Sequence, residues 1–362
     1  MSLNNKNILL VIAGLGNGGA ENQIVKLWEL LNSNSYNCYL LILNKKQKVD
    51  IKFSYIINND KFLSLELSNK DRFLFFKIIK GLARIYKTKN ITTIISFLHI
   101  ANIFTRMSKI ICPKIKIITS IRSDFSVQYN RRNKLIEYIL SPMSSSILSN
   151  SKATVTYLQK KWFIGQKVVY LPNIIDCEHK DHSFFNKNKQ EPYTIVSVGR
   201  LSEEKNYDFL LQVAKELLGM DVKFVIVGDG SQRKNIESKI QEFKLDNVVL
   251  AGLVLDVNLY FKDANLFFMP SFFEGISNAM IEAICNMVPV LVSSGANTSK
   301  IIEDGHDGFE FNEYNPKKVT DMILGIRRLS NEVIDDMCDR AKSKVVKEMG
   351  SENVLRILGQ VL

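Results

Sequence analysis

Short runs of apolar, mostly β-branched residues alternate along the chain with longer stretches in which apolar residues recur every three or four positions. The short runs predict buried parallel strands, and the longer stretches predict the helices that cover them. In the first half the strands are expected at 8–13, 38–43, 92–96, 115–119, 146–149 and 168–171. In the second half they are expected at 194–198, 223–227, 248–250, 266–269 and 290–292. The pattern predicts an α/β fold with two doubly wound sheets.

The chain of 362 residues exceeds what one hydrophobic core usually organises. A polar stretch without periodicity separates the two series of strands and is typical of a linker. We therefore predict a first domain at 1–175, a linker at 176–190, a second domain at 191–345 and a C-terminal helix at 346–362 that packs back on the first domain. Two Rossmann-like domains facing each other across a cleft are the expected architecture, because such sheets bind ligands at the carboxyl ends of their strands.

The cysteines and the apolar segments of the chain indicate the cellular compartment in which the protein is expected. The 5 cysteines are scattered, odd in number and never in a C-x-x-C spacing, which argues against a disulfide framework and against a zinc site. A reducing cytoplasm is the expected location. The first apolar run, 8–13, is too short for a secretory signal, and no segment approaches the roughly 18 uninterrupted apolar residues of a membrane-spanning helix. Any membrane contact is expected to be peripheral.

Charge is divided unevenly between the halves of the chain, although the total is +11. Residues 1–175 hold 26 Lys and Arg against 8 Asp and Glu, a net charge of +18, whereas residues 176–362 carry a net charge of −7. The front half therefore favours an anionic partner. Nucleic acid, acidic lipid headgroups and phosphate-bearing substrates all satisfy this condition.

A glycine-rich turn follows the first predicted strand and formally matches G-x-G-x-x-G, starting at Gly14. A dinucleotide-binding enzyme would have an acidic residue after its second strand, but residues 44–46 are Asn, Lys and Lys. This disfavours a nicotinamide cofactor. Two interpretations remain, a flexible turn between strand and helix, or a turn whose Gly18 and Gly19 let backbone amides approach a phosphate or a sugar.

Two cations follow the first strand of the second half. Arg200 and Lys205 lie on the loop that leaves this strand, where both side chains can converge on one diphosphate. The alternative is a solvated loop in which they pair with Glu203 and Glu204.

The stretch 269–283 is the most informative in the chain. A strand ends at Pro270, a loop carries Glu274 and Gly275, and a helix is expected to start near Ser277 with amides free to bind an anion. Glu282 lies about one turn into that helix. One carboxylate can bind sugar hydroxyls and the other ribose hydroxyls. The alternatives are a helix N-cap for Glu274 and a partner of the helix dipole for Glu282.

With these motifs together, the chain resembles the family 4 retaining glycosyltransferases over nearly its whole length. The matching segments are the turn at 18–21, the junction at 171–176, the clamp at 198–205, the loops at 227–230 and 251–252, and the two glutamates with seven residues between them. The resemblance implies the GT-B fold. It also implies that Arg200 and Lys205 neutralise the leaving diphosphate, that Glu274 binds the donor sugar and that Glu282 binds the ribose.

The resemblance assigns further donor contacts to backbone and apolar positions. These are Gly18, Gly19, Gly228, Val254, Gly275, Ile276, Ser277 and Asn278, with the nucleotide base near Leu253 and Val254. Lys300 departs from the pattern, because the family usually has a glutamate there, which leaves the donor open. His99 and Arg122 follow strands of the front half and are candidates for contact with the acceptor or the transferred sugar. For His99 a structural role remains the alternative, whereas loops at strand ends favour function for Arg122.

The reaction implied by the resemblance is transfer of a hexose or N-acetylhexosamine, with retention, from a nucleotide-diphosphate sugar, with a UDP-sugar favoured. The acceptor would be a glycan or a polyprenyl-diphosphate-linked glycan in bacterial surface polysaccharide synthesis, such as O-antigen, lipopolysaccharide or capsule. No cofactor or metal is expected, and no Asp-x-Asp occurs in the chain. Cationic side chains and helix amides would stabilise the leaving group.

Residues 70–87 predict a helix with one basic face, formed by Lys77, Lys80, Arg84 and Lys87. This face is either the solvated side of a packed helix or a docking surface for an anionic membrane. The charge of the front half favours docking at the inner face of the cell membrane.

The rival functions are another GT-B enzyme, such as a sugar-nucleotide epimerase or a phosphorylase, and a nucleic-acid-binding protein. The nucleic-acid alternative rests on charge alone, without a basic-aromatic motif.

Overall fold

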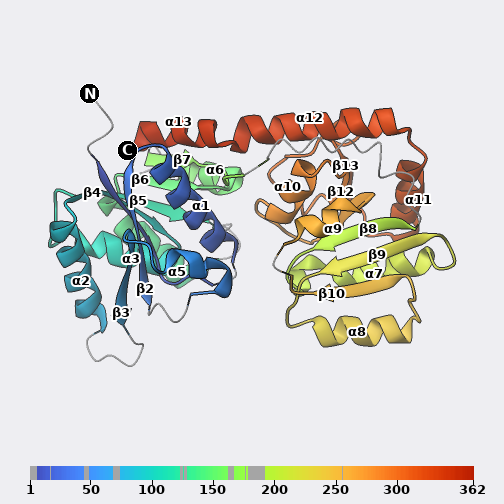
Figure 1. Cartoon of the computed structure of the whole chain (residues 1–362), viewed down its shortest axis with the longest axis horizontal. Helices are drawn as coiled ribbons and strands as arrows, with labels where there is room; N and C mark the ends of the chain where they lie inside the picture. The colour runs from blue at the N-terminus through green and yellow to red at the C-terminus, as the bar shows by residue number, and fades with distance from the viewer. Residues whose placement is uncertain are drawn as a thin grey trace. The chain divides into compact units, whose positions relative to one another are not determined.

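A computed structural model describes residues 6–16, 18–44, 49–67, 74–122, 125, 129–161, 167–175, 177, 192–254 and 256–362. The chain divides into two compact units (Figure 1). The front unit comprises Met1–Ile174 and Ser351–Leu362, and the second unit comprises Ile175–Gly350. The last helix of the chain therefore belongs to the front unit.

The front unit is built on a parallel sheet of seven strands in the order β3-β2-β1-β4-β5-β6-β7. The strands are β1 (Asn7–Ile12), β2 (Asn37–Asn44), β3 (Phe62–Leu67), β4 (Ile91–Phe97), β5 (Lys116–Ile121), β6 (Ser146–Ser149) and β7 (Val168–Tyr170). Successive residues of β1 face opposite sides, since Ile8 and Leu10 join one apolar cluster and Leu9 and Val11 join another. Burial on both faces explains the continuous apolar runs of these strands.

Helices cover both faces of this sheet. They are α1 (Gly19–Ser33), η3 (Ile51–Ile56), α2 (Leu74–Thr88), α3 (His99–Ser108), α5 (Arg131–Leu140), η4 (Ser141–Met143), α6 (Lys152–Lys161) and α13 (Ser351–Val361). Helices α1 and α13 pack on one face, where Leu27, Val354 and Leu358 share a cluster with the strands. Helices α2 and α3 pack on the other, through Ile78, Leu82 and neighbouring side chains.

The second unit repeats this plan with a parallel sheet of six strands in the order β10-β9-β8-β11-β12-β13. The strands are β8 (Tyr193–Val198), β9 (Val222–Val227), β10 (Val248–Gly252), β11 (Leu266–Met269), β12 (Val290–Ser293) and β13 (Phe309–Phe311). The helices are η7 (Glu203–Lys205), α7 (Tyr207–Glu216), α8 (Arg233–Glu242), α9 (Asn258–Lys262), α10 (Asn278–Cys285), α11 (Pro316–Arg327) and α12 (Asn331–Met349). Two apolar clusters, one on each face, confirm the predicted doubly wound α/β class.

Two strands lie outside the predicted set, β3 and β13, and both are edge strands of their sheets. Edge strands tolerate polar residues, and these two contain Ser64 with Glu66 and Glu310, which interrupt any apolar run. The C-terminal helix also starts later than the predicted residue 346, because α12 continues to Met349 and α13 begins at Ser351. Residues 70–73 of the predicted basic helix and residues 176 and 178–190 of the predicted linker lie outside the described residues. Among the described helices, none is long and apolar enough to cross a membrane.

Candidate active site

Each sheet changes the direction of its strand order at one point, and predicted site residues follow the strands that meet there. The change falls between β8 and β11 in the second unit and between β1 and β4 in the front unit. Arg200 and Lys205 follow β8, Glu274 follows β11, and Gly18 and His99 follow β1 and β4. Open parallel sheets bind ligands at such switch points, because the loops diverge there and leave a crevice.

Lys205 and Glu274 form an ion pair between the loops after β8 and β11. The Lys205 ammonium contacts Glu274 Oε1, and the two side chains are only 16% and 15% exposed. Ser271 Oγ donates a hydrogen bond to the same oxygen at 3.2 Å. Partial shielding from water strengthens this pair relative to a surface pair. Two of the three residues predicted to be catalytic are therefore in direct contact.

Gly199 makes space for the Lys205 side chain. A Cβ at position 199 would lie 3.2 Å from Lys205 Nζ and 3.1 Å from the Tyr207 hydroxyl. Lys205 ends helix η7, and Asn206 then adopts a left-handed conformation with φ 52° before α7 begins. Asparagine tolerates this conformation better than most residues. The tight turn thus holds the lysine amine over the end of β8.

Arg200 is exposed, and its charge acts on a neighbouring carboxylate. Burial alone would raise the pKa of Glu204, but hydrogen bonding from Ser202 and the charges of Arg200 and Lys205 bring that pKa below its usual value. Glu204 therefore stays ionised at neutral pH. Its carbonyl accepts a hydrogen bond from Phe272 N at 2.8 Å, which joins the two loops of the site.

The loop that carries Glu274 is held through its backbone. Glu274 N donates to Gly295 O at 2.9 Å, and Thr298 Oγ1 donates to Glu274 O at 2.5 Å. Ser299 Oγ donates to Gly275 O at 3.1 Å. A Cβ at Gly275 would meet no atom within 4 Å, so the space beside this residue is open. The loop is fixed from one side and leaves room for a ligand beside Gly275.

Helix α10 starts after Ser277, which is its N-cap and accepts a hydrogen bond from Met280 N at 3.4 Å. The N-cap alternative considered for Glu274 is therefore wrong.

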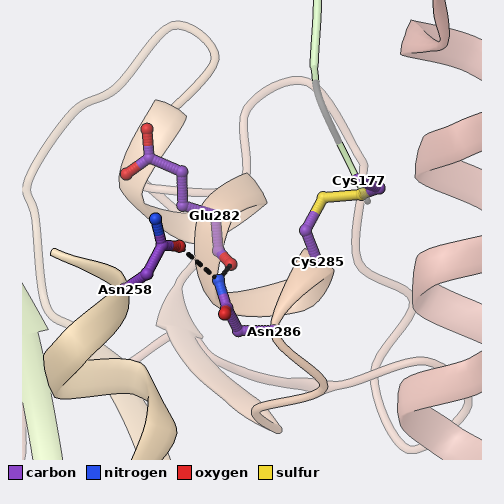
Figure 2. The surroundings of a disulfide bond; sticks show 5 residues. All are labelled: Cys177, Asn258, Glu282, Cys285 and Asn286. Atoms are coloured by element: carbon purple, nitrogen blue, oxygen red, sulfur yellow. Dashed lines mark hydrogen bonds between the residues drawn. A yellow bond between two sulfur atoms is a disulfide. The ribbon is translucent and has the colours of Figure 1, made fainter. Parts of the chain in front are cut away.

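Ile276 packs partly buried against the apolar cluster beneath helix α10, and Asn278 is the first residue of this helix. Glu282 lies one turn further, and in Figure 2 its carboxylate extends away from the disulfide at the end of the helix. Asn286 Nδ2 ties the Glu282 carbonyl to Asn258 Oδ1, with both distances at 2.8 Å.

A disulfide joins Cys177 to Cys285, the last residue of α10 (Figure 2). Their Cα atoms are 5.1 Å apart although 108 positions separate them in the chain. This corrects the expectation that the cysteines form no bridge, since spacing along the chain gives no information about two residues that the fold brings together. The bridge ties the start of the second unit to the helix that carries Glu282.

Gly228 and Val254, both predicted donor contacts, have clear packing environments. Gly228 has φ +141°, and a Cβ there would lie 1.9 Å from Gly199 O, so only glycine fits. Its N–H donates to Gly252 O at 2.8 Å. Val254 packs partly buried against the same apolar cluster as Ile276. Leu253, expected near the base, is 67% exposed.

The glycine turn of the front unit carries a carboxylate. Gly18 is the N-cap of α1, and Gly19 is its first residue. A Cβ at Gly18 would lie 2.2 Å from a carboxylate oxygen of Glu21. An anion that approaches the amides of this turn would therefore meet Glu21, which disfavours a phosphate at this position and leaves the sugar interpretation open.

His99 is the first residue of α3 and belongs to a buried polar cluster. Its Nδ1 lies 2.9 Å from Glu137 Oε1, and Glu137 in turn contacts Arg106 Nη1. Both Glu137 and Arg106 have fully buried side chains. Leu98, the preceding residue, has φ 72° and ψ 159°, a strained conformation for a branched side chain that is typical of functional sites.

Arg122 follows β5, and Lys300 lies in the turn after β12. Arg122 Nη1 donates a hydrogen bond to Leu171 O at 3.2 Å, and its guanidinium lies over the Phe97 ring at 4.6 Å.

Lys300 has a backbone φ of 52°, and its Nζ lies 3.4 Å from Glu310 Oε1. It directly follows Ser299, which binds the Gly275 carbonyl. The residue that departs from the family pattern is thus next to the loop of Glu274.

Three residues of these networks were not predicted, namely Ser271, Tyr207 and Glu137. Burial raises the pKa of the Tyr207 hydroxyl, which keeps it neutral beside Lys205. Burial would raise the pKa of Glu137, but the hydrogen bond with His99 and the charge of Arg106 lower it overall. A signal existed for Glu137, because it is one of only 8 acidic residues in 1–175. No local pattern marks Ser271 or Tyr207.

The two parallel sheets with their covering helices define the class of fold, which is GT-B. Among solved structures, a crystal structure of Anabaena Alr3699/HepE in complex with UDP matches with a TM-score of 0.82 over 98% of both chains. The sequence identity is 14%, so the likeness establishes the fold.

Residues 178–344 match the family Glycosyl transferases group 1. One relative is a Campylobacter jejuni enzyme, the N-acetylgalactosamine-N,N'-diacetylbacillosaminyl-diphospho-undecaprenol 4-alpha-N-acetylgalactosaminyltransferase, which is 28% identical over 83% of this chain and 84% of its own. A second Campylobacter jejuni relative, an alpha-1,4-N-acetyl-D-galactosaminyltransferase acting on a PP-undecaprenol-linked glycan, is 25% identical over 98% of both chains. The chain is thus similar to named glycosyltransferases over nearly its whole length, and residues 178–344 carry the match to the family.

Proposed function

We propose that the protein transfers a hexose or N-acetylhexosamine, with retention, from a UDP-sugar to a polyprenyl-diphosphate-linked glycan during bacterial surface polysaccharide synthesis. The ion pair of Lys205 and Glu274 at the switch point beside Arg200 carries the proposal. The relatives named for transfer to undecaprenol-linked acceptors support the acceptor, and the UDP complex of a structural neighbour supports the nucleotide.

In the proposed reaction, negative charge develops on the nucleotide diphosphate as the bond to the sugar breaks. Lys205 moves from Glu274 to this diphosphate, and Arg200 contributes a second positive charge. Glu274, released from the lysine, accepts hydrogen bonds from the sugar hydroxyls beside Gly275. Glu282 binds the ribose. Cationic side chains and backbone amides supply the stabilisation, so no metal is needed in this scheme.

Membrane docking through helix α2 completes the proposal. Lys77, Lys80, Arg84 and Lys87 are all exposed, whereas Ile78, Ile79, Leu82 and Tyr86 of the same helix are buried. Phe76, at the start of the helix, is 62% exposed. A basic face with an exposed aromatic side chain suits an anionic bilayer, where a polyprenyl-linked acceptor resides. The enzyme would then act at the inner face of the cell membrane.

Thermal unfolding with a panel of UDP-, GDP- and ADP-sugars tests the donor. A ligand that binds only the folded protein stabilises it by about 2.7 kcal/mol at a hundred times its Kd. We expect the largest rise in Tm with a UDP-sugar. Equal Tm with and without all three nucleotides would contradict the proposal, and conversion of the UDP-sugar without acceptor would indicate an epimerase instead.

A further inference from the structure

Two arginines of the front unit have different environments, since Arg106 is fully buried and Arg122 is partly buried. Arg106 is fully buried and has three side-chain partners, because Nε donates to Ser144 Oγ at 2.8 Å, Nη2 donates to Thr119 Oγ1 at 2.8 Å, and Nη1 contacts the Glu137 carboxylate. Its charge and its donors are compensated, as expected for an arginine that stabilises a fold.

Arg122 lacks this compensation. Among the described residues its buried Nε has no hydrogen-bond partner, and its one hydrogen bond to them runs to the Leu171 carbonyl. No carboxylate of the described residues forms an ion pair with it. Burial lowers the pKa of Arg122 to about 9, so the guanidinium remains charged at neutral pH. A partly buried charge without a counterion destabilises the free protein, and an anionic ligand would supply the counterion.

The surroundings of Arg122 suit an anion. The residue follows β5, and its carbonyl partner Leu171 follows β7, so the guanidinium lies at the carboxyl edge of the sheet. Strands β6 and β7 end in two neutral amides, since Asn150 Nδ2 donates to Asn173 Oδ1 at 3.0 Å. The Lys152 ammonium lies 5.2 Å from the ring of Tyr170, the residue before Leu171, and adds positive charge to this edge. Stacking on Phe97 orients the planar fork, which matches two phosphate oxygens.

We propose that Arg122 binds a phosphoryl anion at this edge of the front sheet, and that the anion is the diphosphate of the acceptor. The inference rests on the proposed function for the identity of the acceptor. It assigns the recognition of the diphosphate linker to a specific residue of the front unit, separate from the donor-binding residues of the second unit.

Calorimetric titration of the full chain with inorganic pyrophosphate, at saturating UDP, tests this site. We expect Arg122→Met to weaken pyrophosphate binding at least tenfold and Arg122→Lys to weaken it less, because lysine keeps the charge without the fork. UDP affinity should be unchanged in both. The exposed Arg131 supplies the control, since Arg131→Met changes the net charge equally and should leave both affinities unchanged.

Thermal unfolding separates ligand binding from a structural role. Arg122→Met removes an uncompensated charge, so its Tm should equal or exceed that of the wild type. Wild-type pyrophosphate affinity in this variant, or no pyrophosphate binding by the wild type, would overturn the proposal. Equal weakening of UDP and pyrophosphate binding would assign the anion to the donor and overturn the acceptor assignment. Failure of the wild type to bind UDP bears on the proposed function alone, because pyrophosphate can also be titrated without UDP.

Discussion

Both units place a cation at the carboxyl end of a parallel sheet, but only one of the two cations has a carboxylate partner. In the second unit Lys205 contacts Glu274. In the front unit Arg122 has no such partner among the described residues. The net charges follow the same division, +18 for residues 1–175 and −7 for residues 176–362. A resident carboxylate holds a cation in place until a ligand replaces it, whereas an uncompensated cation depends on an anion from outside.

The largest expected effect concerns the pair of the second unit. Glu274→Gln and Lys205→Ala should each lower kcat/KM by about a thousandfold, because each removes a charge that acts on the donor. Transfer from the nucleotide sugar is the measurement. Lys318→Ala is the matched control, since Lys318 and Glu313 form an ion pair with exposures of 65% and 62%. Turnover near the wild-type rate in either site variant would refute the assignment of this pair.

A second prediction sharpens the contrast between Arg106 and Arg122. Arg106→Met should lower the free energy of unfolding by about 3–5 kcal/mol, because it leaves the Glu137 carboxylate buried without its cation. Chemical denaturation measures this loss. Arg122→Met, by contrast, should leave the stability unchanged or raise it. Similar losses in both variants would show that the two arginines have the same structural role.

The disulfide of the second unit gives the third prediction. Reduction, or Cys285→Ser, should lower the free energy of unfolding by about 2–4 kcal/mol, because the bridge closes a loop of 108 positions and restricts the unfolded chain. Denaturation with and without a dithiol reductant measures the difference. Cys338→Ser is a control for replacing a buried cysteine that forms no bridge. Labelling of five thiols in the unreduced, unfolded protein would contradict the bridge.

The smallest effect concerns the pH dependence of the front unit. The pKa of Glu137 is lower in the folded protein than its ordinary value, so its contribution to stability is present above that ordinary value. The contribution is lost as the pH falls through the lower, folded value. Wild-type Tm should therefore decline more steeply in acid than that of Glu137→Gln. Parallel Tm curves for the two proteins would show that Glu137 gains no charge stabilisation from Arg106 and His99.

The sequence predicts the central strands of both sheets but neither β3 nor β13. Central strands are buried on both faces and read as apolar runs, whereas these edge strands do not. The site loops are predictable because glycines, cations and glutamates recur there in a known spacing. The contact between Lys205 and Glu274 is not, because it depends on β8 and β11 being neighbours in the sheet. The pairing of Cys177 with Cys285 is not predictable either, because it depends on the fold bringing together two residues that are 108 positions apart.

The central claim is that Lys205 exchanges Glu274 for the diphosphate of a nucleotide sugar. Calorimetric titration of UDP into the wild type and into Lys205→Ala tests this exchange directly. The predicted result is saturable binding by the wild type and at least tenfold weaker binding by the variant, with the wild-type affinity falling as salt concentration rises. Equal UDP affinity in the two proteins would contradict the claim.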